Sequence, residues 1–111
     1  MQSDPQVVDA LFTHTRNEMV FPAGILQRPF FVEANPEYLN FGGMGVVAGH
    51  ELTHGLDSNG RTYDENGTHV DWWTNSTATQ FLAKAQCFKD QYAQFSVPNP
   101  VPGGTPIPVN G

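Results

Sequence analysis

The fold of this chain is decided by one stretch of sequence, Asn40-Phe-Gly-Gly-Met-Gly-Val-Val-Ala-Gly-His-Glu-Leu-Thr-His-Gly-Leu-Asp57. Its period predicts a helix over residues 41–57, because apolar residues recur at every fourth position and form one stripe. The stripe consists of Met44, Ala48, Leu52 and Leu56. We expect it to face a core, and the opposite side of the helix also looks buried. Gly45 and Gly49 each cost a helix roughly 1 kcal/mol relative to Ala, so we expect another backbone or a ligand to approach closely there.

Two histidines of this helix, His50 and His54, are four residues apart and therefore share one face. Two imidazole nitrogens at this spacing can reach one zinc ion at about 2.0–2.1 Å each. Glu51 lies about 100° further around the helix, where it can act as general base on a zinc-bound water. The pattern predicts Zn²⁺ as cofactor and peptide hydrolysis, with Glu51 carrying the water's proton to the departing amine. The alternative is a pair of core histidines that are hydrogen-bonded to backbone.

The motif supplies two protein ligands, whereas a catalytic zinc normally takes three. Asp57, three residues past His54, is better placed as an acceptor that orients a ring N–H than as a ligand. The loop that follows offers four residues that could swing toward the metal: Asp64, Glu65, His69 and Asp71. All four are poor candidates, because they lie in or beside a loop. With two ligands, we expect the isolated chain to bind zinc weakly and to hydrolyse peptides very slowly or not at all.

The period of the hydrophobic residues and the positions of turn-forming residues divide the rest of the chain into segments. Residues 1–40 predict one or two strands between Val7 and Phe21, followed by an irregular loop. Residues 58–73, rich in Asn, Gly and Asp, predict a loop. Residues 74–96 predict an amphipathic helix that is N-capped by Thr74. Its apolar side consists of Ala78, Phe81, Ala85, Phe88, Tyr92 and Phe95. Residues 97–111 predict a Pro/Gly-rich, semi-extended tail that adds nothing to the core.

Composition limits the class of protein. With 111 residues, 39% of them hydrophobic, the chain can form one domain with one modest core. The formal charge of -6 offers no basic patch, which argues against nucleic acid as a partner. No apolar run approaches the roughly 18–20 residues of a membrane span, and the first residues lack the layout of a signal peptide. The expected fold class is mainly α with a small edge β-sheet (α+β).

Several other residues carry weaker signals. Cys87 is the one cysteine, so it is either a buried thiol or paired with a residue outside this chain. Asn66 and Asn75 begin glycosylation sequons, which matter only in a secretory compartment. His14 and His69 read most simply as surface or strand histidines.

Three stretches together resemble the neprilysin and endothelin-converting-enzyme family of zinc metallopeptidases (gluzincins), a likeness that runs from about Val7 to Phe95. The stretches are residues 17–31, 40–57 and 70–74. The resemblance implies a partial zincin-like catalytic domain with an active-site helix and a second amphipathic helix. It also implies that His50 and His54 are zinc ligands, that Glu51 is the catalytic glutamate, and that Asp57 supports the ligands from behind.

The resemblance further implies a substrate site. Phe30, Val46 and Val47 match the pocket for an apolar side chain just after the scissile bond, which implies cleavage of peptides on the amino side of hydrophobic residues. Asp9 and Ala10 match the substrate-binding strand. The family usually has Asn where this chain has Asp9, and an ionised Asp cannot donate a hydrogen bond, so one bond to the peptide backbone is in doubt.

The resemblance also implies parts that this chain lacks. In the family the third zinc ligand is a Glu in a downstream Glu-x-x-x-Asp helix, which would lie beyond Gly111. Cys87 matches a cysteine that pairs near the family's C-terminus, outside this chain. The likeness implies an extracellular or cell-surface parent protein, of which this chain is a central fragment. The alternative function is a non-catalytic peptide-binding or structural fragment without a full zinc site.

Overall fold

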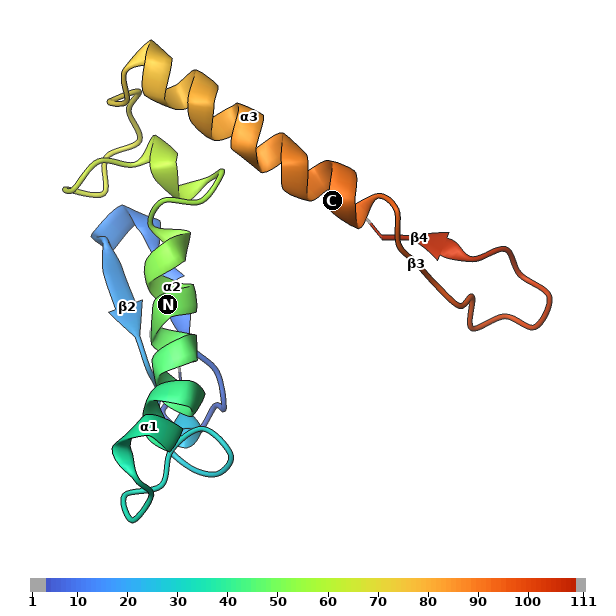
Figure 1. Cartoon of the computed structure of the whole chain (residues 1–111). Coiled ribbons are helices and arrows are strands. Elements are labelled where there is room, and N and C mark those ends of the chain that lie inside the picture. The colour runs from blue at the N-terminus through green and yellow to red at the C-terminus, as the bar shows by residue number, and fades with distance from the viewer. Residues whose placement is uncertain (1–3, 110–111) are drawn as a thin grey trace. The chain divides into compact units, whose positions relative to one another are not determined.

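A computed structural model describes residues 4–109 of the chain (Figure 1). The residues cluster into two compact units that divide between Trp72 and Trp73. The first unit holds the hairpin β1–β2 and the helical segment that ends in α2, and the second holds α3 and the hairpin β3–β4. The predicted helix-rich chain with small sheets is therefore confirmed. In the described part of the chain, no helix has both the length and the apolar character that a membrane crossing requires.

A short antiparallel hairpin opens the first unit. Strand β1 (Leu11–Thr13) pairs with β2 (Glu18–Val20), with Leu11 opposite Val20 and Thr13 opposite Glu18. The single turn of 3-10 helix η1 (His14–Arg16) joins them, and Asn17 closes the turn with φ 46°. Asn tolerates this left-handed conformation better than most residues. The predicted strands between Val7 and Phe21 are thus present as two strands of three residues each.

A continuous helical segment follows the loop that begins at Phe21. It consists of α1 (Glu37–Asn40), a π-helical turn η3 (Phe41–Gly45) and α2 (Val46–His54). Helix therefore starts four residues before the predicted boundary at residue 41, and the regular α-helix ends at His54 rather than at Asp57. The π turn coincides with three glycines, the residue type that loses least from a distorted backbone.

A neighbouring loop approaches the backbone of this helical segment closely at Gly43. A Cβ at Gly43 would lie 2.3 Å from the carbonyl oxygen of Phe30, so only glycine lets the loop that carries Phe30 pack here. The alternative that another backbone approaches Gly45 and Gly49 closely was wrong. A Cβ at Gly49 would meet nothing within 4 Å, and one at Gly45 would make only ordinary contact with the ring of Phe41.

The apolar stripe of the helix is only partly covered. Met44 and Ala48 are half-buried, but Leu52 is 62% exposed and Leu56 is 55% exposed. The prediction that the whole stripe faces a core is therefore wrong for the described residues. The hairpin lies against α2 (Figure 1) and covers a different side, on which Glu51 is only 5% exposed.

The loop after α2 folds back on itself and on the hairpin. It contains the 3-10 turn η4 (Gly60–Thr62) and an isolated antiparallel bridge between Tyr63 and His69. The side-chain Nδ2 of Asn17 donates from the hairpin to the carbonyl of Glu65 at 3.2 Å. The predicted loop is confirmed, with a short paired segment inside it.

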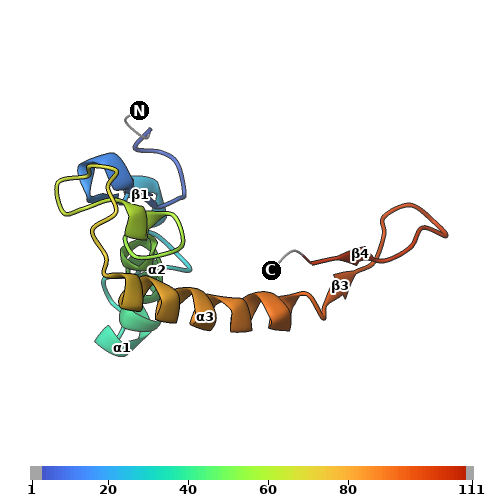
Figure 2. The ribbon, with the colours of Figure 1, turned by 90° about the horizontal axis from the view of Figure 1, so that it is seen from above.

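The second unit begins with the helix that the sequence predicts most clearly (Figure 2). Helix α3 runs over Asn75–Tyr92, and the Thr74 hydroxyl accepts from the Thr77 amide at 3.2 Å as its N-cap. No residue of α3 is buried within the described chain, and Phe88 is 64% exposed. After α3, strand β3 (Ser96–Val97) pairs antiparallel with β4 (Ile107–Pro108). The predicted tail thus contains a small hairpin rather than extended chain alone.

Candidate metal centre

The two motif histidines of α2 point at one place. The Nε2 atoms of His50 and His54 lie 2.9 Å apart, and their ring planes are almost perpendicular, at 89°. Two nitrogens bound tetrahedrally to zinc at about 2.0–2.1 Å would be roughly 3.3 Å apart. The two nitrogens would therefore have to move apart by only a few tenths of an ångström to bind the ion. The donor set fits zinc.

Glu51 completes the cluster from a buried position. Ligand atoms of His50, Glu51 and His54 all lie within 4.8 Å of one another, and Glu51 is only 5% exposed. Among residues 4–109 this is the group of three His, Cys, Asp or Glu residues close enough to share one ion. A carboxylate held beside two imidazoles can take a proton from a water at the same point.

Asp57 holds the ring of His54 from behind. The Nδ1–H of His54 donates to Asp57 Oδ2 at 2.8 Å, which leaves the Nε2 lone pair free for a metal. Asp57 Oδ1 accepts from the amides of Asn59 and Gly60 at 2.9 and 2.7 Å. Partial burial by itself would raise the pKa of this carboxyl, but hydrogen bonds from Gly60, His54 and Asn59, with the His54 charge, hold the pKa below its ordinary value of 3.8.

The backbone of His54 is held as well, by residues that the sequence did not single out. His14 Nε2 lies 3.2 Å from the carbonyl oxygen of His54, and a Cβ at Gly60 would lie 1.9 Å from the same oxygen. His14 is half-buried and lies in η1, directly after strand β1. Forty residues separate it from His54, and no local pattern could have revealed the contact.

The residues expected to bind substrate line one pocket beside the histidines. This pocket of about 330 Å³ is lined by Val8, Asp9, Ala10, Ile25, Phe30, Val46, Val47, His50 and Glu51. All five predicted substrate residues are in this set. A second pocket of about 330 Å³ shares Asp9, Ala10, His50 and Glu51, and extends along β1 to His14 and His54. His50 and Glu51 thus line both pockets, whereas His54 is part of the second.

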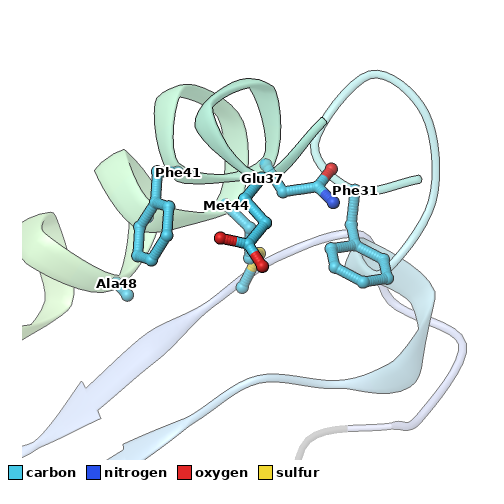
Figure 3. A pocket seen from close by; sticks show the side chains of 7 residues that line it. Phe31, Glu37, Phe41, Met44 and Ala48 are labelled. Atoms are coloured by element: carbon cyan, nitrogen blue, oxygen red, sulfur yellow. The ribbon is translucent and has the colours of Figure 1, made fainter. Parts of the chain in front are cut away.

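A third pocket is apolar and contains none of the predicted site residues. It has a volume of about 360 Å³ and is lined by Phe31, Glu37, Asn40, Phe41, Met44, Gly45 and Ala48. Figure 3 shows the Glu37 carboxylate between the rings of Phe31 and Phe41, with Met44 and Ala48 along the helix. The sequence signal for this pocket was the half-buried end of the apolar stripe.

The remaining predicted residues lie apart from the cluster. The four loop residues offered as a third ligand, Asp64, Glu65, His69 and Asp71, do not belong to the group that could share an ion. Asp64 instead accepts from the amides of Asn66 and Thr68 within the loop. Both sequon asparagines, Asn66 and Asn75, are exposed. Cys87 is a free, exposed thiol on α3, so the alternative that it is buried was wrong.

Comparison with known proteins assigns the chain to a family. The profile of Peptidase family M13 matches residues 9–111, which include the hairpin β1–β2, helix α2 and all of α3. The chain belongs to peptidase family M13. The resemblance to neprilysin and endothelin-converting enzyme is thereby confirmed, and the His50, Glu51 and His54 cluster is compatible with the zinc site of a metallopeptidase.

Curated relatives of this M13 chain are much longer than it is. It is 54% identical over 90 residues to membrane metallo-endopeptidase-like 1 of Mus musculus and 50% identical over 93 residues to endothelin-converting enzyme 1 of Homo sapiens. The matches cover 81% and 84% of this chain and 12% of each relative. The M13 chain thus spans about an eighth of the length of the relatives it matches.

Solved structures agree with the assignment. An inhibitor complex of zinc metalloprotease Zmp1 from Mycobacterium tuberculosis is 45% identical, with a TM-score of 0.81, over 84% of this chain and 14% of that one. PepO from Lactobacillus rhamnosis is 33% identical, also with a TM-score of 0.81, over 84% of this chain and 15% of that one. The M13 chain therefore has the local fold of one part of these larger proteins.

Proposed function

We propose that this chain supplies the zinc-binding helix of a metalloendopeptidase, with His50 and His54 as ligands and Glu51 as general base. One observation carries the proposal: two Nε2 atoms converge at 2.9 Å beside a buried carboxylate, in a chain of family M13. Isolated core histidines would not need a carboxylate at the same point, and burying one without a partner is costly.

The roles follow from the position of each group. Zinc, when bound, polarises the scissile carbonyl and acidifies a water. The Glu51 carboxylate takes the proton of that water and delivers it to the departing amine. Asp57 keeps the Nδ1 proton on His54, so that Nε2 stays an electron-pair donor. The hairpin covers one side of the cluster and keeps part of the bulk water away from it. Charge interactions are stronger where water is excluded.

The pocket lined by Phe30, Val46 and Val47 supports a preference for peptides with a hydrophobic residue just after the scissile bond. Its volume of about 330 Å³ is of the size that takes one large side chain, and it opens beside His50 and Glu51. Asp9 and Ala10 line the same pocket and would meet the peptide backbone. An ionised Asp9 accepts hydrogen bonds but cannot donate them, so it should favour an N–H of the substrate.

We further propose that the third protein ligand is not among these 111 residues and that the chain alone is nearly inactive. The cluster has two imidazoles and one general base, one ligand short of a catalytic zinc site. The small share of the relatives' length that the chain spans supports a fragment of a larger catalytic domain. A peptide-binding or structural fragment is the alternative, favoured by the missing ligand.

We also propose an extracellular or cell-surface location for the parent protein, with Cys87 paired to a cysteine outside this chain. The exposed thiol on α3 and the exposed sequon residues Asn66 and Asn75 support this, as does the membrane protein among the relatives. We propose peptides as the substrates of the parent protein.

The decisive test separates zinc binding from catalysis. Titration calorimetry with zinc chloride should show binding to the wild-type chain and to Glu51→Gln, and loss of binding in His50→Ala. In a longer polypeptide that contains this chain and cleaves peptides, Glu51→Gln should abolish turnover while zinc content stays near normal. Chelator-sensitive cleavage by the pure 111-residue chain would contradict the proposal that the third ligand lies outside it. Turnover by Glu51→Gln would contradict the proposal that Glu51 is the general base.

A further inference from the structure

The carbonyl oxygen of His54 lies at a point where three parts of the first unit meet. His54 is the last residue of α2, and the carbonyls of a last turn have no partner within the helix. The ring of His14 reaches this oxygen from the hairpin, with Nε2 at 3.2 Å. Gly60 packs against it from the following turn, where a Cβ would stand only 1.9 Å away.

The ring of His14 is itself held on two sides. Its centroid lies 5.3 Å from that of Phe12 in an edge-on contact and 5.3 Å from that of Tyr63 in a tilted one. Phe12 is on the strand before η1, and Tyr63 follows the turn η4. These two ring contacts hold the imidazole against the His54 carbonyl from both sides.

His54 is therefore fixed through two separate bonds. Asp57 holds its side chain at Nδ1, and His14 holds its backbone. Together they set where Nε2 points, 2.9 Å from the Nε2 of His50. His14 also ties α2 to the strand that follows Asp9 and Ala10, the residues of the substrate pocket.

We propose that His14 is a positioning residue of the metal centre, which acts by donating its Nε2–H to the carbonyl of His54. It does not belong to the group of residues that could share one ion, and its ring contacts the His54 carbonyl instead. Its donor bond keeps the second histidine ligand at a fixed position relative to the first. The same bond fixes the position of the metal-binding helix against the hairpin. The inference rests on the proposed zinc site, since positioning matters only if His54 is a ligand.

The test compares three variants by zinc titration of the 111-residue chain. His14→Phe keeps a ring against Phe12 and Tyr63 but removes the donor, and should weaken zinc binding about threefold to tenfold. His14→Gln restores a donor near the same place and should recover most of the affinity. His69→Phe is the matched control, because His69 also contacts Tyr63 but lies outside the metal cluster, and its affinity should equal wild type.

The outcomes separate the possible failures. Unchanged affinity in His14→Phe, or an equal loss in His14→Phe and His69→Phe, would overturn the role of His14. Wild-type binding no tighter than that of His50→Ala would overturn the proposed zinc site itself. If circular dichroism shows that His14→Phe does not fold, nitrogen NMR of the His14 ring in the wild-type chain at pH 8 tests the proposal instead. It should show the proton on Nε2, and a proton on Nδ1 would overturn the proposal.

Discussion

The two main helices of this chain are held in opposite ways. Helix α3 is 18 residues long, is capped by Thr74 and has no buried residue within the described chain. Helix α2 has nine residues, buries Glu51 and is bonded at the His54 carbonyl by His14, which lies forty residues earlier in the sequence. The helix with the clearest local pattern thus has no buried residue in the part of the chain that the structure describes, and the helix that holds the proposed metal ligands depends on a distant contact.

This difference predicts that changes of the metal site act on α2 and leave α3 alone. The largest effect should come from His50→Ala, which removes one of two converging donors and should lower zinc affinity by more than about 100-fold. In the wild-type chain, zinc should slow amide exchange in α2, and the variant should lose this protection. Equal changes in α3 would mean that the two helices are not independent.

The next largest effect should come from Gly60→Ala. A Cβ there would overlap the His54 carbonyl, so backbone must move, and the free energy of unfolding should fall by about 1–3 kcal/mol. Gly49→Ala is the matched control, because a Cβ there meets nothing, and it should gain up to about 1 kcal/mol. Chemical denaturation measures both. A neutral Gly60→Ala would contradict the close packing at the end of α2.

Asp57→Asn should weaken zinc binding by about tenfold, since the carboxylate orients His54. It should also change the acid sensitivity of the first unit. The pKa of Asp57 is lowered by folding, so its contribution to stability is present above its ordinary pKa of 3.8 and is lost as the pH falls through the lower folded pKa. Wild type should therefore lose stability more steeply than Asp57→Asn below pH 4. Parallel curves from acid titrations followed by circular dichroism would refute this.

The smallest effect should be that of Thr74→Ala. Loss of the N-cap bond to the Thr77 amide should cost α3 about 1 kcal/mol and leave zinc affinity unchanged. Helicity by circular dichroism and the zinc titration are the two measurements. Thr74→Ser is the control that keeps the hydroxyl. A change in zinc affinity would show that α3 is coupled to the metal site after all.

The same contrast explains what the sequence could predict. The cap, extent and period of α3 are local properties, and a local pattern predicted them within a few residues. The bond from His54 to Asp57 is also local, because the two residues are three apart. The hairpin strands were expected from β-branched and aromatic residues, although their register depends on the turn at Asn17.

The failures concern contacts between distant segments. The stripe through Leu52 and Leu56 has the period of a core face, but period alone does not say which side of a helix the rest of the chain covers. The glycine that a neighbouring backbone requires is Gly43 rather than Gly49, because the loop at Phe30 arrives there. His14 could not be found, since no motif links it to His54.

The π turn over Phe41–Gly45 has a consequence for anyone who would transplant this site. A π turn accommodates about one residue more than an α turn, so a helical wheel drawn straight through Glu37–His54 is wrong by one position, or about 100°. A graft that rebuilt the segment as regular α-helix would rotate His50 and Glu51 off the hairpin while preserving every residue. The direction in which the side chains of α2 point is therefore set before His50, by the π turn that precedes the helix.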